Sequence, residues 1–228
     1  MDVSDDGMIY ISGEGMKLYG MFLTAVDEKG TIIWEKMWSD DTFYTSGPQS
    51  IDTIKVSDQA LLLGGFSGGW NEDGSMTYHK LYLAKADFEG NIIWKKVWGA
   101  KGHNYIFDIT TDNAGNIYLT GNTMGNLDGN INSSKNGDCN IESAGCADPF
   151  LIKTDKDGSV LWTRQRGSGY STSNEAGMKI IYGKTDKSIF VLSNVSLFGG
   201  LKIVLRKYNE NGKLIWEKIF EDGDRNFR

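Results

Sequence analysis

The sequence predicts an all-β protein, a β-propeller of four four-stranded antiparallel blades. A tryptophan-bearing segment, "EGNIIWKKVW" at residues 89–98, recurs as close copies that begin at Lys29, Asp157 and Asn211. Short apolar segments before each copy bring every repeat to about four strands, and one such meander is too small to bury both of its faces. We therefore expect the repeats to pack face to face around an axis, within a larger propeller of about six to eight blades.

The first two strands of each repeat are expected to be short and apolar. The first strands lie in "MDVSD", "IDTIKVSD", "IFDITTDN" and "GMKIIYGK". The second strands lie in "GMIYISGE", "QALLLGGF", "GNIYLTGN" and "KSIFVLSN". This order places the blades at about residues 1–50, 51–104, 105–172 and 173–228.

The last two strands of each repeat are expected to form a hairpin around a glycine. An Asp or Asn stands three residues before this glycine, and a tryptophan stands four residues after it. Such an Asp can accept a hydrogen bond from the backbone two residues on, and glycine tolerates a positive φ at a bulge. Since the tryptophan recurs in every repeat, we expect it to pack between blades rather than to bind a ligand. The glycines and tryptophans are Gly30, Gly90, Gly158, Gly212, Trp34, Trp94, Trp162 and Trp216.

The third repeat resembles the bacterial SBBP-type β-propeller repeat. Its segments "DITTDNAGNIYLTGN" and "DPFLIKTDKDGSVLWTRQRG" carry the motif residues of that family. These are Gly115, Asn116, Tyr118, Thr120, Gly121, Phe150, Lys153, Asp155, Gly158 and Trp162. The resemblance implies a propeller that is secreted or exposed at the cell surface, and it carries no catalytic residues. Quinoprotein repeats share the step of four residues from glycine to tryptophan, but the residue before the glycine here is never threonine.

The charge balance and hydropathy exclude two classes of partner. A net charge of −6 without a basic stripe argues against nucleic-acid binding. No apolar run approaches the ~20 residues that span a bilayer. The acidic start "MDVSDDGMIY" lacks the features of a signal peptide, so we expect an export signal to have been removed or to lie upstream.

Loop length varies mainly between the second and third strands. This stretch takes 17 residues from Gly13 to Gly30 but 37 residues from Gly121 to Gly158. Variable loops on a rigid scaffold commonly carry binding residues. We therefore expect a binding face at the loops of the second and third repeats.

The ligand-binding residues are expected in the loop of the second repeat. Trp70 does not recur in the other repeats and stands among flexible polar residues. The expected ligand-binding residues are Trp70, Asn71, Glu72, Asp73 and His79. His79 has a second interpretation, as a polar residue at the start of a strand, and His103 is expected to be a loop residue.

The long loop of the third repeat holds two further hypotheses. Cys139 and Cys146 are the only cysteines, and an even pair in an exported protein predicts a disulfide. Hard oxygen donors in the same loop suit calcium, although a polar turn rich in Asn and Gly is the simpler explanation for them. The expected calcium ligands are Asp128, Asn130, Asn132 and Asp138. No other cofactor is expected, and zinc is disfavoured because the thiols lack neighbouring histidines.

The poverty of catalytic groups favours a non-enzymatic function. We expect an extracellular binding or scaffolding propeller that contacts a protein or a glycan through its loops. Two alternatives stay open: a glycan-acting enzyme or degenerate quinoprotein-like propeller, and a structural subunit of a surface assembly or fibre. The remaining blades, or another chain, are expected to cover the open propeller edges.

Overall fold

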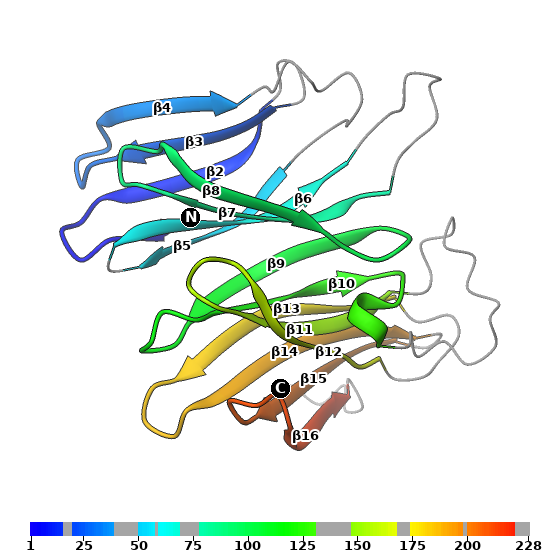
Figure 1. Cartoon of the computed structure of the whole chain (residues 1–228). Helices are drawn as coiled ribbons and strands as arrows, with labels where there is room; N and C mark the ends of the chain where they lie inside the picture. The colour runs from blue at the N-terminus through cyan, green and yellow to red at the C-terminus, as the bar shows by residue number, and fades with distance from the viewer. Residues whose placement is uncertain are drawn as a thin grey trace, which may run out of the picture. The chain divides into compact units, whose positions relative to one another are not determined.

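A computed structural model describes residues 1–15, 20–38, 50–57, 59–68, 78–130, 147–167, 174–197 and 200–221. The described chain forms four separate sheets, each of four antiparallel strands that follow one another in chain order (Figure 1). The predicted all-β propeller blades are thus confirmed, and we number them blades 1 to 4. The chain divides into two compact units: unit 1 holds Met1–Gly99 with His103–Ile109, and unit 2 holds Ala100–Gly102 with Thr110–Arg228.

Blades 1 and 2 belong to unit 1. Blade 1 consists of β1 (Asp2–Val3), β2 (Ile9–Gly15), β3 (Gly20–Val26) and β4 (Ile32–Trp38). Blade 2 consists of β5 (Ser50–Ser57), β6 (Ala60–Ser67), β7 (Lys80–Ala86) and β8 (Ile92–Trp98).

Blade 3 begins at the boundary of the units, and blade 4 lies in unit 2. Blade 3 consists of β9 (Asn104–Thr111), β10 (Ile117–Thr123), β11 (Asp148–Thr154) and β12 (Val160–Gln165), with the short 3₁₀ helix η2 (Leu127–Gly129) after β10. Blade 4 consists of β13 (Asn174–Gly183), β14 (Ser188–Leu197), β15 (Gly200–Tyr208) and β16 (Leu214–Glu221). In the described ranges, no helix has the length and apolar character needed to cross a membrane.

The last hairpin of each blade has the predicted turn. In blade 1, Asp27 Oδ1 accepts hydrogen bonds from the backbone N–H groups of Lys29 at 2.9 Å and Thr31 at 2.8 Å. Gly30 follows with a φ of 82°, and the register shifts by a bulge at Ala25. Asp155 and Asn209 make the same pair of bonds in blades 3 and 4, and Asp87 bonds Asn91 in blade 2.

Within each unit, a tryptophan of one blade covers the hairpin glycine of the next. A Cβ built on Gly90 would meet the Trp34 ring at 2.8 Å, and one on Gly212 would meet the Trp162 ring at 2.9 Å. Both glycines also hold positive φ angles of 77° and 72°. These two positions therefore require glycine for two reasons, the turn and the indole pressed against it.

The apolar core of each unit lies between its blades. In unit 1, Tyr10, Leu23 and Ala25 of blade 1 share one cluster with Leu63 and Tyr82 of blade 2. In unit 2, the corresponding cluster joins blades 3 and 4 through Tyr118, Leu151, Ile180, Tyr182, Ile189, Val191 and Tyr208. The recurring leucine and tryptophan therefore hold adjoining sheets together, as the repeats predict.

The motif residues of blade 3 meet at one buried carboxylate. Asp112 Oδ1 accepts hydrogen bonds from the N–H groups of Ala114 and Asn116, both at 2.9 Å. Its Oδ2 accepts from Asn116 Nδ2 at 2.8 Å and from Tyr118 Oη at 3.3 Å, and Lys153 Nζ lies 3.4 Å away. Burial raises the pKa of Asp112, but these bonds and the nearby cation outweigh burial and leave that pKa below its usual value.

Candidate functional site

His79 is the one predicted ligand-binding residue within the described chain. It directly precedes β7. Trp70, Asn71, Glu72 and Asp73 lie outside the described residues, so their part in the site stays a prediction. The surroundings of His79 therefore define the candidate site.

Five aromatic rings of unit 1 form a connected set with the ring of His79. The ring centroid of Phe66 lies 4.5 Å from that of His79 in a stacked arrangement, and Tyr105 lies 5.2 Å away edge-on. His103 lies 4.6 Å from His79, also edge-on. We call this set the His79 cluster, which consists of Phe66, Tyr78, His79, His103, Tyr105 and Phe107. Every member is partly exposed, so the cluster presents aromatic surface to solvent.

The strand pattern explains why these rings meet. Tyr105 and Phe107 alternate along β9, and their rings stack with centroids 6.0 Å apart. Phe66 lies at the end of β6. At Gly68, just beyond it, a Cβ would come within 2.8 Å of the Cα of His79. The end of β6 therefore passes close to the start of β7 and brings Phe66 onto the histidine ring.

Hydrogen bonds fix both histidines. His79 Nδ1 and Tyr105 Oη lie 2.8 Å apart, and the backbone N–H of His79 donates to His103 Nδ1 at 3.3 Å. The His79 carbonyl oxygen accepts from the backbone N–H of Asn104 at 3.0 Å and from its Nδ2 at 2.9 Å. Since Nδ1 of His103 is an acceptor, the neutral ring carries its proton on Nε2.

The cluster is uncharged at neutral pH. Burial, and secondarily the nearby His103, lower the pKa of His79 to about 4. Burial also lowers the pKa of His103. Burial, with a smaller contribution from Asp52, raises the pKa of the Tyr105 phenol. At neutral pH the cluster therefore offers neutral rings and hydrogen-bonding edges.

Sequence reasoning did not place His103 in this site. The two histidines are 24 positions apart and were expected in separate structural settings, yet the start of β9 brings Tyr105, and His103 just before it, to the start of β7. One signal was available, since these are the only two histidines of the chain and each adjoins a tyrosine-bearing strand end.

The predicted calcium site is described only in part. The Asp128 carboxylate in η2 accepts a hydrogen bond from the Thr163 hydroxyl of β12. Asn130 Nδ2 donates to the Leu127 carbonyl oxygen at 2.8 Å. Among residues whose placement is described, no three metal-ligating side chains of His, Cys, Asp or Glu gather at one point. Asn132, Asp138 and the expected Cys139–Cys146 disulfide lie outside the described residues, so calcium and the disulfide stay predictions.

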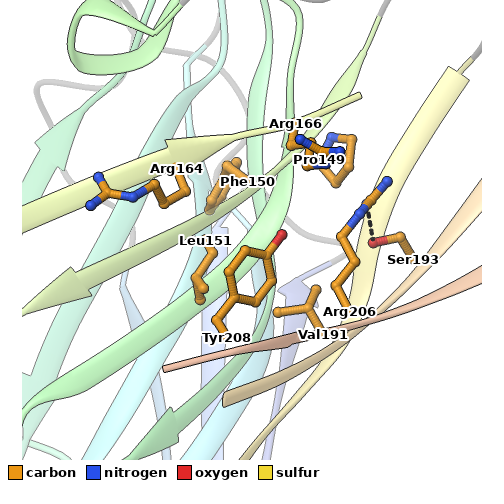
Figure 2. A pocket seen from close by; sticks show the side chains of 9 residues that line it. All are labelled: Pro149, Phe150, Leu151, Arg164, Arg166, Val191, Ser193, Arg206 and Tyr208. Carbon is orange, nitrogen blue, oxygen red and sulfur yellow. Dashed lines mark hydrogen bonds between the residues drawn. The ribbon is translucent and has the colours of Figure 1, made fainter. Parts of the chain in front are cut away.

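A small pocket in unit 2 is lined by three arginines, Arg164, Arg166 and Arg206, together with apolar side chains. Figure 2 shows its side chains, which come from blades 3 and 4. Arg206 is 3% exposed, and its Nε donates to Glu217 Oε2 at 2.6 Å. Its second contact is with Ser193 Oγ at 3.4 Å. Arg166 Nε lies 3.7 Å from the same Glu217 oxygen. Glu217 therefore balances the charge of the buried Arg206, so that guanidinium is not left unpaired in the pocket.

Residues 100–128 match the family model described as the SBBP β-propeller repeat. The matched segment includes Gly115, Asn116 and Tyr118, which carry the resemblance predicted from the sequence. No curated protein matches the chain. Among solved structures, the chain is similar to the Neurospora crassa Pan2 WD40 domain, with 10% identity and a TM-score of 0.46 over 96% of this chain. The match covers 60% of that chain. The similarity to the SBBP β-propeller repeat thus covers residues 100–128, which include β9 and β10.

Proposed function

We propose that this chain is a non-catalytic binding propeller that holds an extracellular glycan at the His79 cluster. The observation that supports this proposal is a set of partly exposed aromatic rings that carry no charge at neutral pH. Propeller folds serve many functions, so the fold alone does not identify a ligand.

The chemistry of the cluster suits a sugar ring. The apolar C–H face of a sugar can stack on Tyr105 or Phe107, while its hydroxyl groups need donors and acceptors at the rim. The ring edges of His79 and His103 supply such groups. A neutral sugar also brings no charge, so it does not require a protonated histidine whose pKa burial has lowered.

The predicted loop residues would extend this surface. Trp70, Asn71, Glu72 and Asp73 belong to the segment that joins β6 to β7, between Phe66 and His79 in the sequence. A tryptophan among polar residues offers a large apolar ring with hydrogen-bonding groups beside it. A secreted or surface-exposed location, implied by the SBBP resemblance, would give the cluster access to such ligands.

A binding role fits the cluster better than catalysis does. A histidine with a pKa of about 4 is a weak base at neutral pH. The raised pKa of Tyr105 keeps its phenol protonated. Among the described residues, no group of three His, Cys, Asp or Glu side chains offers a metal-assisted alternative.

A glycan array probed with the purified chain, followed by calorimetry with the best ligand, tests the proposal. Tyr105→Ala should weaken binding about tenfold or more, since it removes a stacking surface. Tyr105→Phe keeps the ring and should retain most of the affinity. Leu161→Ala removes an apolar side chain that is 53% exposed on β12 in unit 2, and should leave binding unchanged.

Three outcomes would contradict the proposal. One is the absence of any bound glycan on the array. The second is equal affinity of Tyr105→Ala and the wild type. The third is the appearance of shortened or unsaturated glycan products on incubation, which would favour the glycan-acting enzyme instead.

A further inference from the structure

Blade 4 exposes a face that is buried in the equivalent blades. In this face the recurring leucine and tryptophan lie beside each other, as Leu205 and Trp216 do in blade 4. Leu23 in blade 1 is 0% exposed and Leu151 in blade 3 is 2% exposed, because the next blade of the same unit packs on each of them. Leu205 is half-buried. The inner surface of a blade contact is thus open to solvent on blade 4.

Large apolar side chains surround Leu205 on that face. The strand pairings Ile181↔Phe190, Phe190↔Lys207 and Lys207↔Trp216 place these side chains on one side of the sheet, which we call the Trp216 face. Ile181 is 64% exposed, Ile203 41% and Phe220 53%. Met21, the blade 1 counterpart of Ile203, is 4% exposed.

Blade 1 exposes the complementary face. On blade 2 the side chains Leu63 and Tyr82, which receive blade 1, are 0% and 3% exposed. Their blade 1 counterparts, Ile11 and Phe22, are only half-buried. A Cβ on Gly30 would meet nothing within 4 Å, whereas Gly90 and Gly212 each lie against an indole ring. We call this side of blade 1 the Gly30 face.

We propose that the Trp216 face of one copy binds the Gly30 face of a second copy, so that the chains associate head to tail. This contact would repeat, between copies, the contact that the chain makes within unit 1 and again within unit 2. A contact between two different faces is heterologous, and it continues from copy to copy until it closes a ring or forms a filament. The proposal is independent of glycan binding at the His79 cluster.

Polar contacts at the edge of each blade contact also favour a second copy of the chain as the partner. In unit 1, Lys36 Nζ donates to Asn91 Oδ1 of the next hairpin at 2.5 Å. In unit 2, Arg164 Nε donates to the Gly212 carbonyl oxygen at 3.0 Å, again in the next hairpin. Lys218 is the equivalent residue of blade 4, two positions after Trp216. Docked on blade 1, its ammonium would reach the hairpin carbonyl oxygens beside Gly30.

Sedimentation velocity over a range of concentrations tests the association. The wild-type chain should form oligomers whose masses are multiples of the chain mass. Ile181→Lys puts a charge in the Trp216 face and should weaken association about tenfold or more. Ile93→Lys is its matched control. Ile93 is 56% exposed on β8, the outer strand of blade 2, so a lysine there stays in solvent.

A second variant tests the other face. Gly30→Asn fills the place where the indole would lie, and Asn tolerates positive φ better than most residues. Its matched control is Gly129→Asn, since Gly129 also has a positive φ of 79° and open space around it.

Mixing the two variants gives the decisive result. Ile181→Lys keeps an intact Gly30 face, and Gly30→Asn keeps an intact Trp216 face, so an equimolar mixture should form dimers and nothing larger. A wild-type chain that stays monomeric at all concentrations would overturn the proposal. Equal loss of association in Ile181→Lys and Ile93→Lys, or a mixture that behaves like its separate components, would also overturn it. Glycan binding by the monomeric variants is measured separately and does not depend on these results.

Discussion

The indole of Trp34 donates a hydrogen bond from Nε1 to the carbonyl oxygen of Phe88, 3.1 Å away in the hairpin of the following blade. The same ring lies over Gly90, two residues further along that hairpin. One side chain thus fixes both the distance and the rotation between blades 1 and 2. Recurrence of the tryptophan in the sequence reflects this double role.

Gly90→Ala should destabilise the protein more than Gly30→Ala. Both residues hold a positive φ, so each substitution is expected to cost about 1–2 kcal/mol in backbone strain. At Gly90 the new methyl group also meets the Trp34 ring at 2.8 Å, which adds about 1–3 kcal/mol. Urea unfolding of the two variants at low protein concentration measures the difference, and equal losses would show that the indole does not rest on the glycine.

The free energy of unfolding should fall as the pH falls from about 6.5 toward 4. The pKa of His79 lies near 4 in the folded chain, below its unfolded value of 6.5, so the unfolded chain binds more protons in this window. Tyr105 and His103 face this ring, and Asp52 acts on Tyr105. His103 contributes with the same sign because its pKa is also lowered. The loss of unfolding free energy that His79 causes should stop growing once the pH is below its folded pKa of about 4.

Unfolding of His79→Gln across the same pH range isolates this contribution. The variant should lose less stability than the wild type between pH 6.5 and 4.5, a window stated from the His79 values. Carboxylates with lowered pKa, such as Asp112, act mainly at lower pH and should behave alike in both proteins. An identical pH slope in the variant and the wild type would exclude His79 as the source.

Asp112→Ala should cost about 2–4 kcal/mol of stability. The substitution removes an acceptor of four hydrogen bonds and leaves Lys153 Nζ, in a side chain that is 12% exposed, without its ion-pair partner. Asp155→Ala is the matched control, since Asp155 makes the same type of turn at a position less buried than that of Asp112. In thermal unfolding, Asp112→Ala should have a clearly lower melting temperature than the control. An equal melting temperature would show that Asp112 contributes only its turn.

Glu217→Gln should cost about 3–5 kcal/mol, because it leaves the buried Arg206 guanidinium without a compensating charge. The double variant Arg206→Met with Glu217→Leu should be less destabilised than Glu217→Gln, since no buried charge is left. A double-mutant cycle based on urea unfolding measures this coupling. Additive effects of the two positions would contradict the pairing seen in unit 2.

The parts of the fold that sequence predicts are those set by local chemistry. The turn at Asp27 and Gly30 depends on residues within a span of five positions, so its hydrogen bonds follow from composition alone. The tryptophan contacts were predictable because repetition shows that a side chain serves packing rather than one ligand. Sixteen strands in four sheets follow from the same period.

The parts that sequence did not predict depend on distant contacts. His79 and His103 meet because β9 packs in unit 1, and neither residue lies in a repeating motif. Arg206 occupies a strand position where alternation gives no reason to expect a buried charge, and only the position of Glu217 on β16 makes it stable there. Such pairs are invisible to periodicity, because periodicity reports which side of a strand a residue occupies and not what it meets.

Within each unit, the first blade supplies an indole and the second blade supplies the glycine beneath it, as the pairs Trp34 with Gly90 and Trp162 with Gly212 show. A duplication of one whole repeat would therefore inherit matching surfaces at both of its borders. Arrays of this kind can gain or lose repeats in evolution without a new type of interface, because every copied repeat carries the same contact residues.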